Sequence, residues 1–212
     1  MDKFDLFKEL PEGFRLATED DLPLVNLTLA QAFSDCFYPI PSIKIPYSAA
    51  LKFNYELGSN CSLNALENGA ILTNEDFSAV LCLAPFEKRA VYNVDKLYKI
   101  LLDNCSKEAA DNVMKIFDYI SEGETKVQVR DGCIFVDAFA VQPPKQGNKL
   151  GSKLMRRLFA ECEEKNRDLY LFTNTERNNS IYNHFGYTTV LEIQNKELNS
   201  DTYYLYWKAN SK

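Results

Sequence analysis

Histidine is nearly absent from this chain of 212 residues, which contains a single one, His184. The six cysteines are scattered along the sequence and form no C-x-x-C pair. Zinc sites draw mostly on these two residue types at short spacings. The sequence therefore predicts no metal site. It predicts free thiols in a reducing compartment, and so a cytoplasmic protein.

Long apolar runs are missing as well. No segment approaches the ~20 apolar residues of a membrane-spanning helix, and the mixed charged and apolar start, Met1–Leu10, lacks the pattern of a signal peptide. The chain also lacks a basic excess, because its net charge is -6 and its pI is about 5.0. We therefore expect neither a membrane nor a nucleic-acid partner. The acidic balance favours a cationic partner such as an amine.

The most informative stretch starts with the apolar run Cys133–Val141, which has the length and the β-branched and aromatic content of a strand. Pro143 and Pro144 end that strand, because proline donates no ladder hydrogen bond. A polar loop with two glycines covers 146–151. Apolar residues then recur at helical spacing, at Leu150, Leu154, Leu158 and Phe159. Strand, loop and helix N-terminus together direct free backbone N–H groups to one point, which suits a phosphate group.

Neither the dinucleotide fingerprint nor the nucleoside-triphosphate fingerprint occurs in this loop. It resembles instead the phosphate loop of the GNAT superfamily of acyl-CoA-dependent N-acyltransferases. In that family a strand ending V-x-P is followed by Q/R-x-x-G-x-G/A and a helix beginning G-S-x-L, and Val141–Pro143, Gln146–Gly151 and Gly151–Leu154 match in register. Lys149 departs from the family, which usually has glycine there. On this segment alone, an ordinary strand-to-helix connection is an open alternative.

A second segment resembles the next motif of the same family. The strand-like run Asp168–Thr173 is followed by E-x-N, a short helix and G-F/Y. The positions that match are Glu176, Asn178, Ile181, Tyr182, Gly186 and Tyr187. The two motifs have the order and spacing of the family, and the close resemblance covers about residues 133–190.

The resemblance implies an α/β (α+β) fold. A mixed, mostly antiparallel central sheet is flanked by helices, and its central strands splay apart. We interpret residues 1–212 as one such domain with a helical insertion at about 86–130, before the central strand. Strands are expected at 13–18, 69–73, 77–84, 127–141 with a turn at 131–132, 168–173, 188–194 and 202–208. Helices are expected from 18 to 33, from 47 to 57 with Gly58 as the stop, at 92–104 and at 107–120. The insertion is either a wall over the acceptor side or an extension of the core.

The resemblance also implies the cofactor, acetyl-CoA, and the residues that hold it. Backbone groups of Phe139, Ala140 and Val141 bind the pantetheine arm, and one N–H there, expected to be that of Phe139, faces the thioester oxygen. The pyrophosphate lies on the amides of Gln146, Gly147, Asn148, Lys149, Leu150, Gly151 and Ser152. Asn174 and Asn178 complete this site. Lys149 also places a cation near the phosphates.

Tyr182 occupies the position of the family's general acid near the sulfur. Its hydroxyl is neutral at pH 7 and can donate a proton; a packed aromatic residue is the alternative. Asp137 interrupts an apolar strand and shares a face with Phe139 and Val141 by alternation, which suggests a general base or a structural ion pair. In the family the first two helices flank the acceptor, so Asp35 and Tyr38 are candidate substrate-binding residues, with turn and core packing as the alternative. His184 is expected to be structural or on the surface.

Two functions remain open on the sequence. The first is an N-acetyltransferase that moves an acetyl group from acetyl-CoA to a primary amine of a small molecule or peptide by direct attack in a ternary complex. The second is an acyl-CoA-binding regulatory module with little or no catalysis. Either protein is expected to be a monomer or a homodimer.

Overall fold

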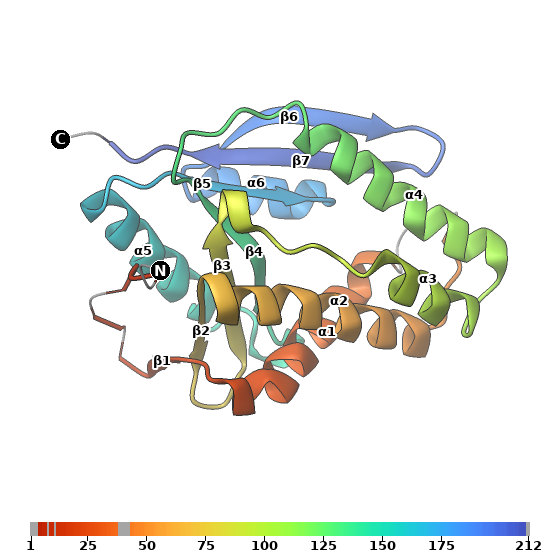
Figure 1. Cartoon of the computed structure of the whole chain (residues 1–212), viewed down its shortest axis with the longest axis horizontal. Helices are drawn as coiled ribbons and strands as arrows, with labels where there is room; N and C mark the ends of the chain where they lie inside the picture. Colours follow the sequence, from red (N-terminus) through yellow and green to blue (C-terminus); the bar gives the residue numbers. More distant parts are fainter. Residues whose placement is uncertain (1–3, 8, 11, 38–42, 211–212) are drawn as a thin grey trace.

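The computed structural model describes residues 4–7, 9–10, 12–37 and 43–210 (Figure 1). The strands are β1 (Phe14–Leu16), β2 (Ala70–Asn74), β3 (Ala79–Pro85), β4 (Ile134–Val141), β5 (Leu169–Thr173), β6 (Thr188–Asn195) and β7 (Ser200–Trp207). The helices are α1 (Leu22–Phe37), α2 (Tyr47–Asn68), α3 (Val94–Leu102), α4 (Lys107–Glu124), α5 (Leu150–Glu164) and α6 (Glu176–His184). Short 3-10 helices are η1 (Glu19–Asp21), η2 (Phe86–Lys88) and η3 (Pro143–Lys145).

All strands belong to one sheet in the order β1-β2-β3-β4-β5-β7-β6. Every neighbouring pair is antiparallel except β4 and β5, which are parallel. The crossover between these two strands contains α5, as parallel pairing requires. The mixed, mostly antiparallel sheet expected from the sequence is confirmed. It contains two hairpins, β2–β3 and β6–β7.

β4 and β5 pair at only two positions, Ile134 with Leu169 and Phe135 with Tyr170. Beyond these positions the two strands have no ladder partners in each other, so they leave a gap in the middle of the sheet. A further irregularity lies on the other side of β4. Cys82 of β3 pairs with Ala138 and Leu83 with Val136, so that Asp137 is the extra residue of a β-bulge.

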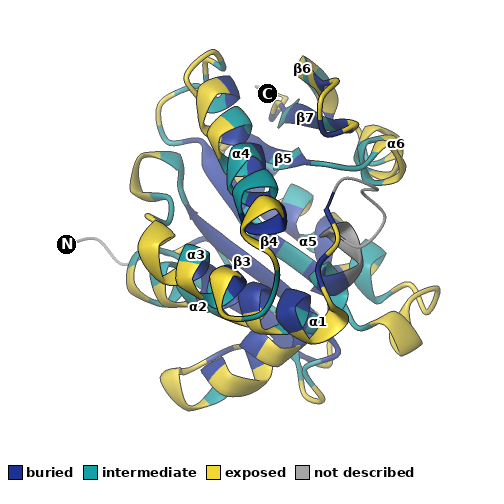
Figure 2. Ribbon diagram, turned by 90° about the vertical axis from the view of Figure 1, so that its right-hand side faces the viewer, coloured by how far each residue is buried: buried dark blue, intermediate teal, exposed yellow. Residues whose placement is uncertain are grey.

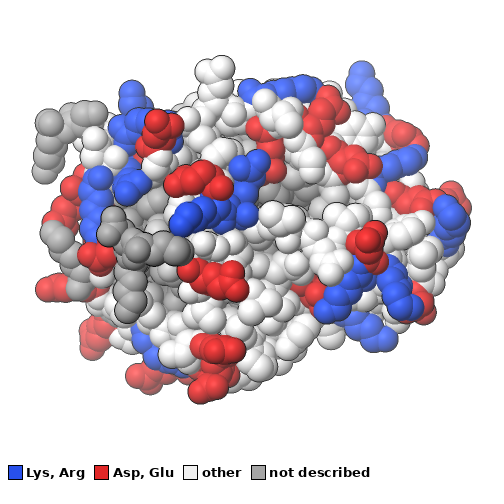
Figure 3. All heavy atoms as spheres, viewed as in Figure 1, with Lys and Arg blue, Asp and Glu red and all other residues white. Residues whose placement is uncertain are grey.

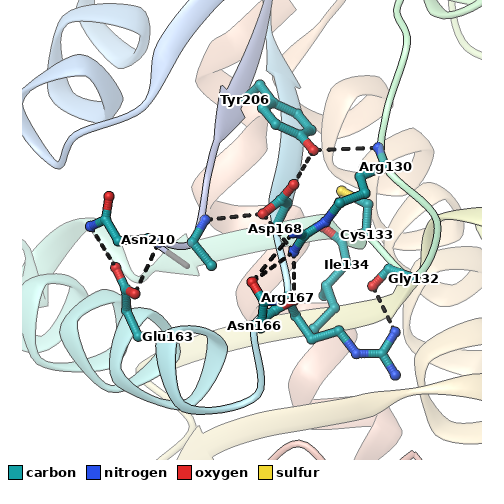
Figure 4. Close-up of polar contacts among 11 residues, drawn as sticks. Arg130, Gly132, Cys133, Ile134, Glu163, Asn166, Arg167, Asp168, Tyr206 and Asn210 are labelled. Carbon is teal, nitrogen blue, oxygen red and sulfur yellow. Dashed lines mark hydrogen bonds and ion pairs between the residues drawn. The ribbon is translucent and has the colours of Figure 1, made fainter. Parts of the chain in front are cut away.

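The paired end of β4 and β5 is held by a polar cluster around Asp168, which we call the Asp168 cluster (Figure 4). The Asp168 side chain is buried and accepts from the Ala209 amide at 3.0 Å and from the Tyr206 hydroxyl. It also pairs with the Arg130 guanidinium at 2.9 Å. The Asp168 carbonyl accepts from the Ile134 amide of β4 at 2.9 Å. One residue, through its carboxylate and its backbone carbonyl, therefore ties together the start of β5, β7, the start of β4 and the segment before it.

Helices cover both faces of the sheet (Figure 2). On one face, α1 and α2 pack on β2, β3 and β4 through a core that includes Val25, Leu29, Val80 and Ala138. On the same face α4 lies against β7 and β6, and α3 packs between it and α2. The opposite face is covered by α5, whose buried side chains include Leu154 and Leu158. None of the described helices is long and apolar enough to cross a membrane.

The expected helical insertion forms α3 and α4. Ser106 begins α4 by accepting from the Ala109 amide, as an N-cap does. Near its other end, α4 docks on β7, because the Tyr204 hydroxyl donates to the carbonyls of Tyr119 and Ile120. Gly123 allows this approach, since a Cβ there would lie 2.0 Å from the Tyr204 hydroxyl oxygen. The helix predicted at 107–120 is longer than expected, because α4 continues through Glu124.

Gly58 does not end α2, which continues for ten more residues to Asn68. A Cβ at Gly58 would lie 3.0 Å from Leu29 Cβ and 3.1 Å from Leu29 Cδ1. The glycine is therefore a packing residue that lets α1 and α2 come close. A glycine at a helix crossing and a glycine at a helix end are the same in sequence, which explains the wrong prediction.

Residues 127–133 were predicted to begin the central strand, but β4 starts at Ile134. The Arg130 amide bonds to the Tyr206 hydroxyl at 3.3 Å, and the Cys133 amide bonds back to the Arg130 carbonyl. The amides of Arg130 and Cys133 therefore have hydrogen-bond partners outside the ladders of the sheet. The apolar residues Val127 and Val129 pack against the core without forming a strand. The turn predicted at 131–132 is present.

Candidate active site

A cavity of about 570 Å³ lies on the face of the sheet that carries α2 and α4, over the gap between β4 and β5. Its floor is formed by the two parted strands, from Phe135 to Phe139 and from Leu171 to Asn174. α2 forms one wall through Asn54, Leu57, Gly58 and Cys61, and α4 the other through Ile116, Phe117, Ile120, Ser121 and Glu124. The segment 87–92 and the start of α6 complete the lining. α4 contributes both to the core and to this wall. That this wall lies over an acceptor stays a prediction.

Asp137 projects into this cavity from the bulge in β4. Its Oδ1 accepts from the Tyr92 hydroxyl at 3.1 Å, and its Oδ2 is buried with no hydrogen-bond partner in the described part of the chain. Burial raises the pKa of Asp137 to about 6, against the opposing effect of hydrogen bonding from Cys61 and Tyr92. A carboxylate with a free buried oxygen and a pKa near 6 is suited to accept a proton at neutral pH.

The prediction that Asp137 shares a face with Phe139 and Val141 is wrong. Phe139 and Val141 pack with the core on the α5 side, whereas Asp137 points to Tyr92 on the α1 and α2 side, where Ala138 and Ala140 also lie. The bulge is the cause, because its extra residue shifts the alternation of side chains by one position.

Tyr182 lines the same cavity from α6. Its ring is half-buried and packs edge-on against Tyr187, with the ring centroids 5.7 Å apart. Asn174 and Asn178 lie beside it in the lining. Asn174 is oriented by donating to Thr202 Oγ1 at 2.8 Å, and the Thr175 hydroxyl begins α6 by accepting from the Asn178 amide at 3.1 Å. The structure thus brings the two predicted catalytic residues, Asp137 and Tyr182, to one cavity.

The edge of β4 that faces the gap presents backbone groups of Phe139 and Val141. The Gln142 amide donates to the Ser78 carbonyl at 2.8 Å, so Ala140, two residues earlier, directs its N–H and C=O to β3. By alternation, Phe139 and Val141 direct theirs to the gap. The Val141 carbonyl accepts from the Gln146 side chain at 3.2 Å. Of the three backbone positions predicted to bind the cofactor arm, two therefore face the gap.

The predicted phosphate loop is exposed and ends at the N-terminus of α5. Lys149 has a left-handed backbone with φ of 62°, a conformation that favours glycine and so accounts for the family's preference at this position. In the described part of the chain, the backbone amides of 147–152 have no backbone acceptor. A Cβ at Gly151 would lie 3.0 Å from the Phe139 ring, so glycine allows α5 to begin close to β4. Free amides at a helix N-terminus form an anion-binding site.

The comparisons with known proteins agree with this geometry. A model of the acetyltransferase (GNAT) family matches residues 116–187, from α4 to the turn before β6. A structure from Corynebacterium glutamicum, described as a histone acetyltransferase HPA2 and related acetyltransferase, has a TM-score of 0.64 at 15% identity and covers 94% of this chain and 97% of its own. This is the GNAT fold. The resemblance inferred from the two sequence motifs is confirmed.

Two further solved structures share the GNAT fold. The arylalkylamine N-acetyltransferase 2 of Aedes aegypti has a TM-score of 0.59 at 13% identity, with 93% of this chain and 98% of that chain covered. The C-terminal condensation domain of Ebony, in complex with β-alanyl-dopamine, has a TM-score of 0.64 at 7% identity, with 92% and 98% covered. At these identities the likeness concerns the fold alone. A search of curated protein sequences finds no significant match.

Some predicted residues lie outside the cavity or outside the described part of the chain. Asp35 lies in α1, but its side chain is not described, and Tyr38 lies outside the described residues. His184 is exposed at the end of α6 and is not among the residues lining the cavity. No cluster of three metal-binding side chains occurs in the described ranges. The acidic and basic side chains are interspersed over the face shown in Figure 3.

The sequence did not reveal the residues that reach the cavity from α2 and from the segment 87–92. Tyr92 is one, since it holds Asp137 across 45 positions in the chain. Arg89 is another, with its guanidinium over the Phe86 ring and 3.7 Å from Glu124. Burial raises the pKa of Glu124, while Arg89 opposes this rise. No local pattern identifies such residues, because tertiary packing alone brings them together.

Proposed function

We propose that this protein is an N-acetyltransferase that moves an acetyl group from acetyl-CoA to the primary amine of a small molecule by direct attack in a ternary complex. One observation carries this proposal. The buried carboxylate of Asp137, with its free Oδ2, lines the same cavity as Tyr182 and the open edge of β4. The proposed base, the proposed acid and the strand edge that would bind the donor therefore all border one cavity.

The residues present fit acetyl-CoA. The left-handed Lys149, the free amides after it and the close approach of α5 at Gly151 form a cradle for its pyrophosphate. The backbone of Phe139 and Val141 offers the arm an open strand edge, beside Asn174 and Asn178. When bound, acetyl-CoA supplies the thioester whose carbonyl carbon accepts the amine. The Phe139 N–H is the donor that we assign to the thioester oxygen, where negative charge develops.

Asp137 is the general base in this proposal. The attacking amine must lose a proton, and Oδ2 is the atom that receives it. Its negative charge also attracts the ammonium form of the acceptor into a cavity with apolar walls. Tyr182 is the general acid, because its neutral hydroxyl donates a proton to the departing sulfur.

An amine acceptor agrees with the description of the mosquito structure as an arylalkylamine N-acetyltransferase. We propose a small molecule rather than a peptide, because the 570 Å³ must hold both the acetyl end of the donor and the part of the acceptor that reacts. The five described cysteines are all free, which supports a cytoplasmic place of action.

The test combines the purified protein, acetyl-CoA and a panel of primary amines. We expect an acetylated amine, identified by mass spectrometry, and one equivalent of released CoA. Mass spectrometry is needed because the protein's own thiols react with thiol reagents. Calorimetric titration with CoA is done in parallel. Binding of CoA without acetylation of any amine would instead support the alternative, an acyl-CoA-binding regulatory module.

A further inference from the structure

Two side chains that line the same cavity carry buried polar atoms without a hydrogen-bond partner in the described part of the chain. One is Asp137, whose Oδ2 accepts no hydrogen bond in the described ranges. The other is Asn54 of α2, which is fully buried and has no partner for either Nδ2 or Oδ1 among the described residues. Buried amides are almost always hydrogen-bonded. An unpaired one in a cavity wall indicates that a ligand supplies its partner.

The fold places these two groups at separate ends of the acceptor space. Asn54, Gly58 and Cys61 lie on one face of α2, three to four residues apart, and all three line the cavity. Cys61 lies beside Tyr92, with 3.8 Å from Sγ to the hydroxyl oxygen, and Tyr92 bonds to Asp137. Cys61 lies seven positions after Asn54, which corresponds to roughly 10 Å along the helix axis. Asn54 is therefore about that far from the Asp137 end.

Apolar side chains fill the walls between these two ends. The Phe117 ring has its centroid 6.3 Å from that of Tyr92, at the Asp137 end, and 5.8 Å from that of Phe53, next to Asn54. Leu57, Ile116 and Ile120 also line the cavity. Such walls suit an apolar body of ring size, and they offer no hydrogen bonds to a chain of polar groups.

We propose that Asn54 is the specificity-determining residue of the acceptor site. It binds a hydroxyl or carbonyl group on the acceptor, at the end of the cavity away from the reacting amine. The acceptor class is then a small amine with an apolar ring-sized body and one distal hydrogen-bonding group. This inference rests on the proposed function, since it places the amine at Asp137.

The experiment compares tyramine with 2-phenylethylamine, which differs only by the phenolic hydroxyl. For the unmodified protein, we expect kcat/KM to favour tyramine by roughly 10–100-fold, because the analogue leaves a buried amide unpaired. In Asn54→Leu, which has a similar volume and no polar atoms, the ratio should fall to about one through loss of activity on tyramine alone. Asn68→Leu is the matched control on the same helix, and it should keep the ratio of the unmodified protein.

Stability gives a second readout. Asn54→Leu removes a buried amide without a partner, so its melting temperature should not fall. If this variant does not fold, Asn54→Ala replaces it in the same comparison. An unchanged tyramine preference in the Asn54 variants overturns the inference, even when both amines are acetylated. If neither amine is acetylated, the proposed function fails for this class. Calorimetric titration of both amines then decides the matter, and equal affinities overturn the role of Asn54.

Discussion

At the residue scale, Asp137 combines a functional position with an energetic cost. Its carboxylate is buried on a bulge and receives one hydroxyl hydrogen bond, from Tyr92. Burial raises its pKa from 3.8 to about 6. Between these two values the unfolded chain has already lost the proton that the folded protein still holds. The contribution of this raised pKa to the free energy of unfolding is fully present below about pH 4. It is lost as the pH rises through about 6.

Asp137→Asn should therefore lose activity and gain stability. The rise of about 2 in pKa corresponds to roughly 3 kcal/mol, so the variant should resist urea better at pH 8 by up to that amount, and by almost nothing at pH 4. Its kcat/KM should fall ~10²–10⁴-fold. For the unmodified protein, kcat/KM should decline below pH 6. A variant with full activity, or with equal stability at pH 8, would contradict the assignment of a buried base.

Tyr182→Phe tests the general acid. The substitution removes the hydroxyl and keeps the edge-on packing against Tyr187. We expect kcat to fall ~10²–10⁴-fold, with little change in acetyl-CoA affinity or melting temperature. Single-turnover rates are the decisive measurement, because slow product release masks the chemical step in steady state. An unchanged single-turnover rate would remove the proton donor and leave the base in place.

At the scale of elements, the contact between α5 and β4 depends on one missing side chain. In Gly151→Ala the new Cβ would lie 3.0 Å from Phe139 Cζ and 3.4 Å from Val141 Cγ2. Overpacking of this kind costs ~1–3 kcal/mol, and it moves the amides of the loop away from β4. We expect a lower melting temperature and weaker CoA binding by calorimetry.

The control for Gly151→Ala is a double-mutant cycle with Phe139→Leu, which removes the ring that the new Cβ meets. The double variant should recover a large part of the lost stability, since the two positions are in contact. If the stability losses of the two single variants simply add in the double variant, α5 and β4 do not meet at this point.

The elements that the sequence could predict are those with local signals. Local sequence patterns identify the GNAT-like motifs without any tertiary information. They are the apolar run before Pro143, the glycines at 147 and 151, and the segment from Glu176 to Tyr187. The predictions for Gly58 as a helix stop and for the face of Asp137 were wrong. A close helix crossing gives Gly58 its role, and a bulge reverses the face of Asp137. Asn54 lies in an ordinary helical sequence, and only the fold brings it to the cavity.

At the scale of the whole molecule, ligand binding should stabilise the fold, because the proposed sites for acetyl-CoA do not exist in the unfolded chain. A ligand at 100 times its Kd contributes ~2.7 kcal/mol, which for a chain of this size raises Tm by ~5–10 °C. Differential scanning fluorimetry with acetyl-CoA measures this shift. Adenosine alone is the control, since it lacks the pyrophosphate and the arm. An equal shift with adenosine would place the binding energy outside the loop at 146–152.

The Asp168 cluster lies at the end of β4 and β5 that takes no part in the proposed chemistry (Figure 4). β4 and β5 pair with each other only at this end, so this end is the pivot of any rotation of one strand relative to the other. Phe139 is five residues from Ile134, roughly 16 Å along an extended strand, so a rotation of about 5° at the pivot displaces it by about 1.4 Å. A misplacement of about 1 Å is enough to slow an enzyme ~100-fold. In the proposed enzyme, we therefore expect the width of the gap, and with it the rate, to depend on Asp168, Arg130 and Tyr206, which lie away from the cavity.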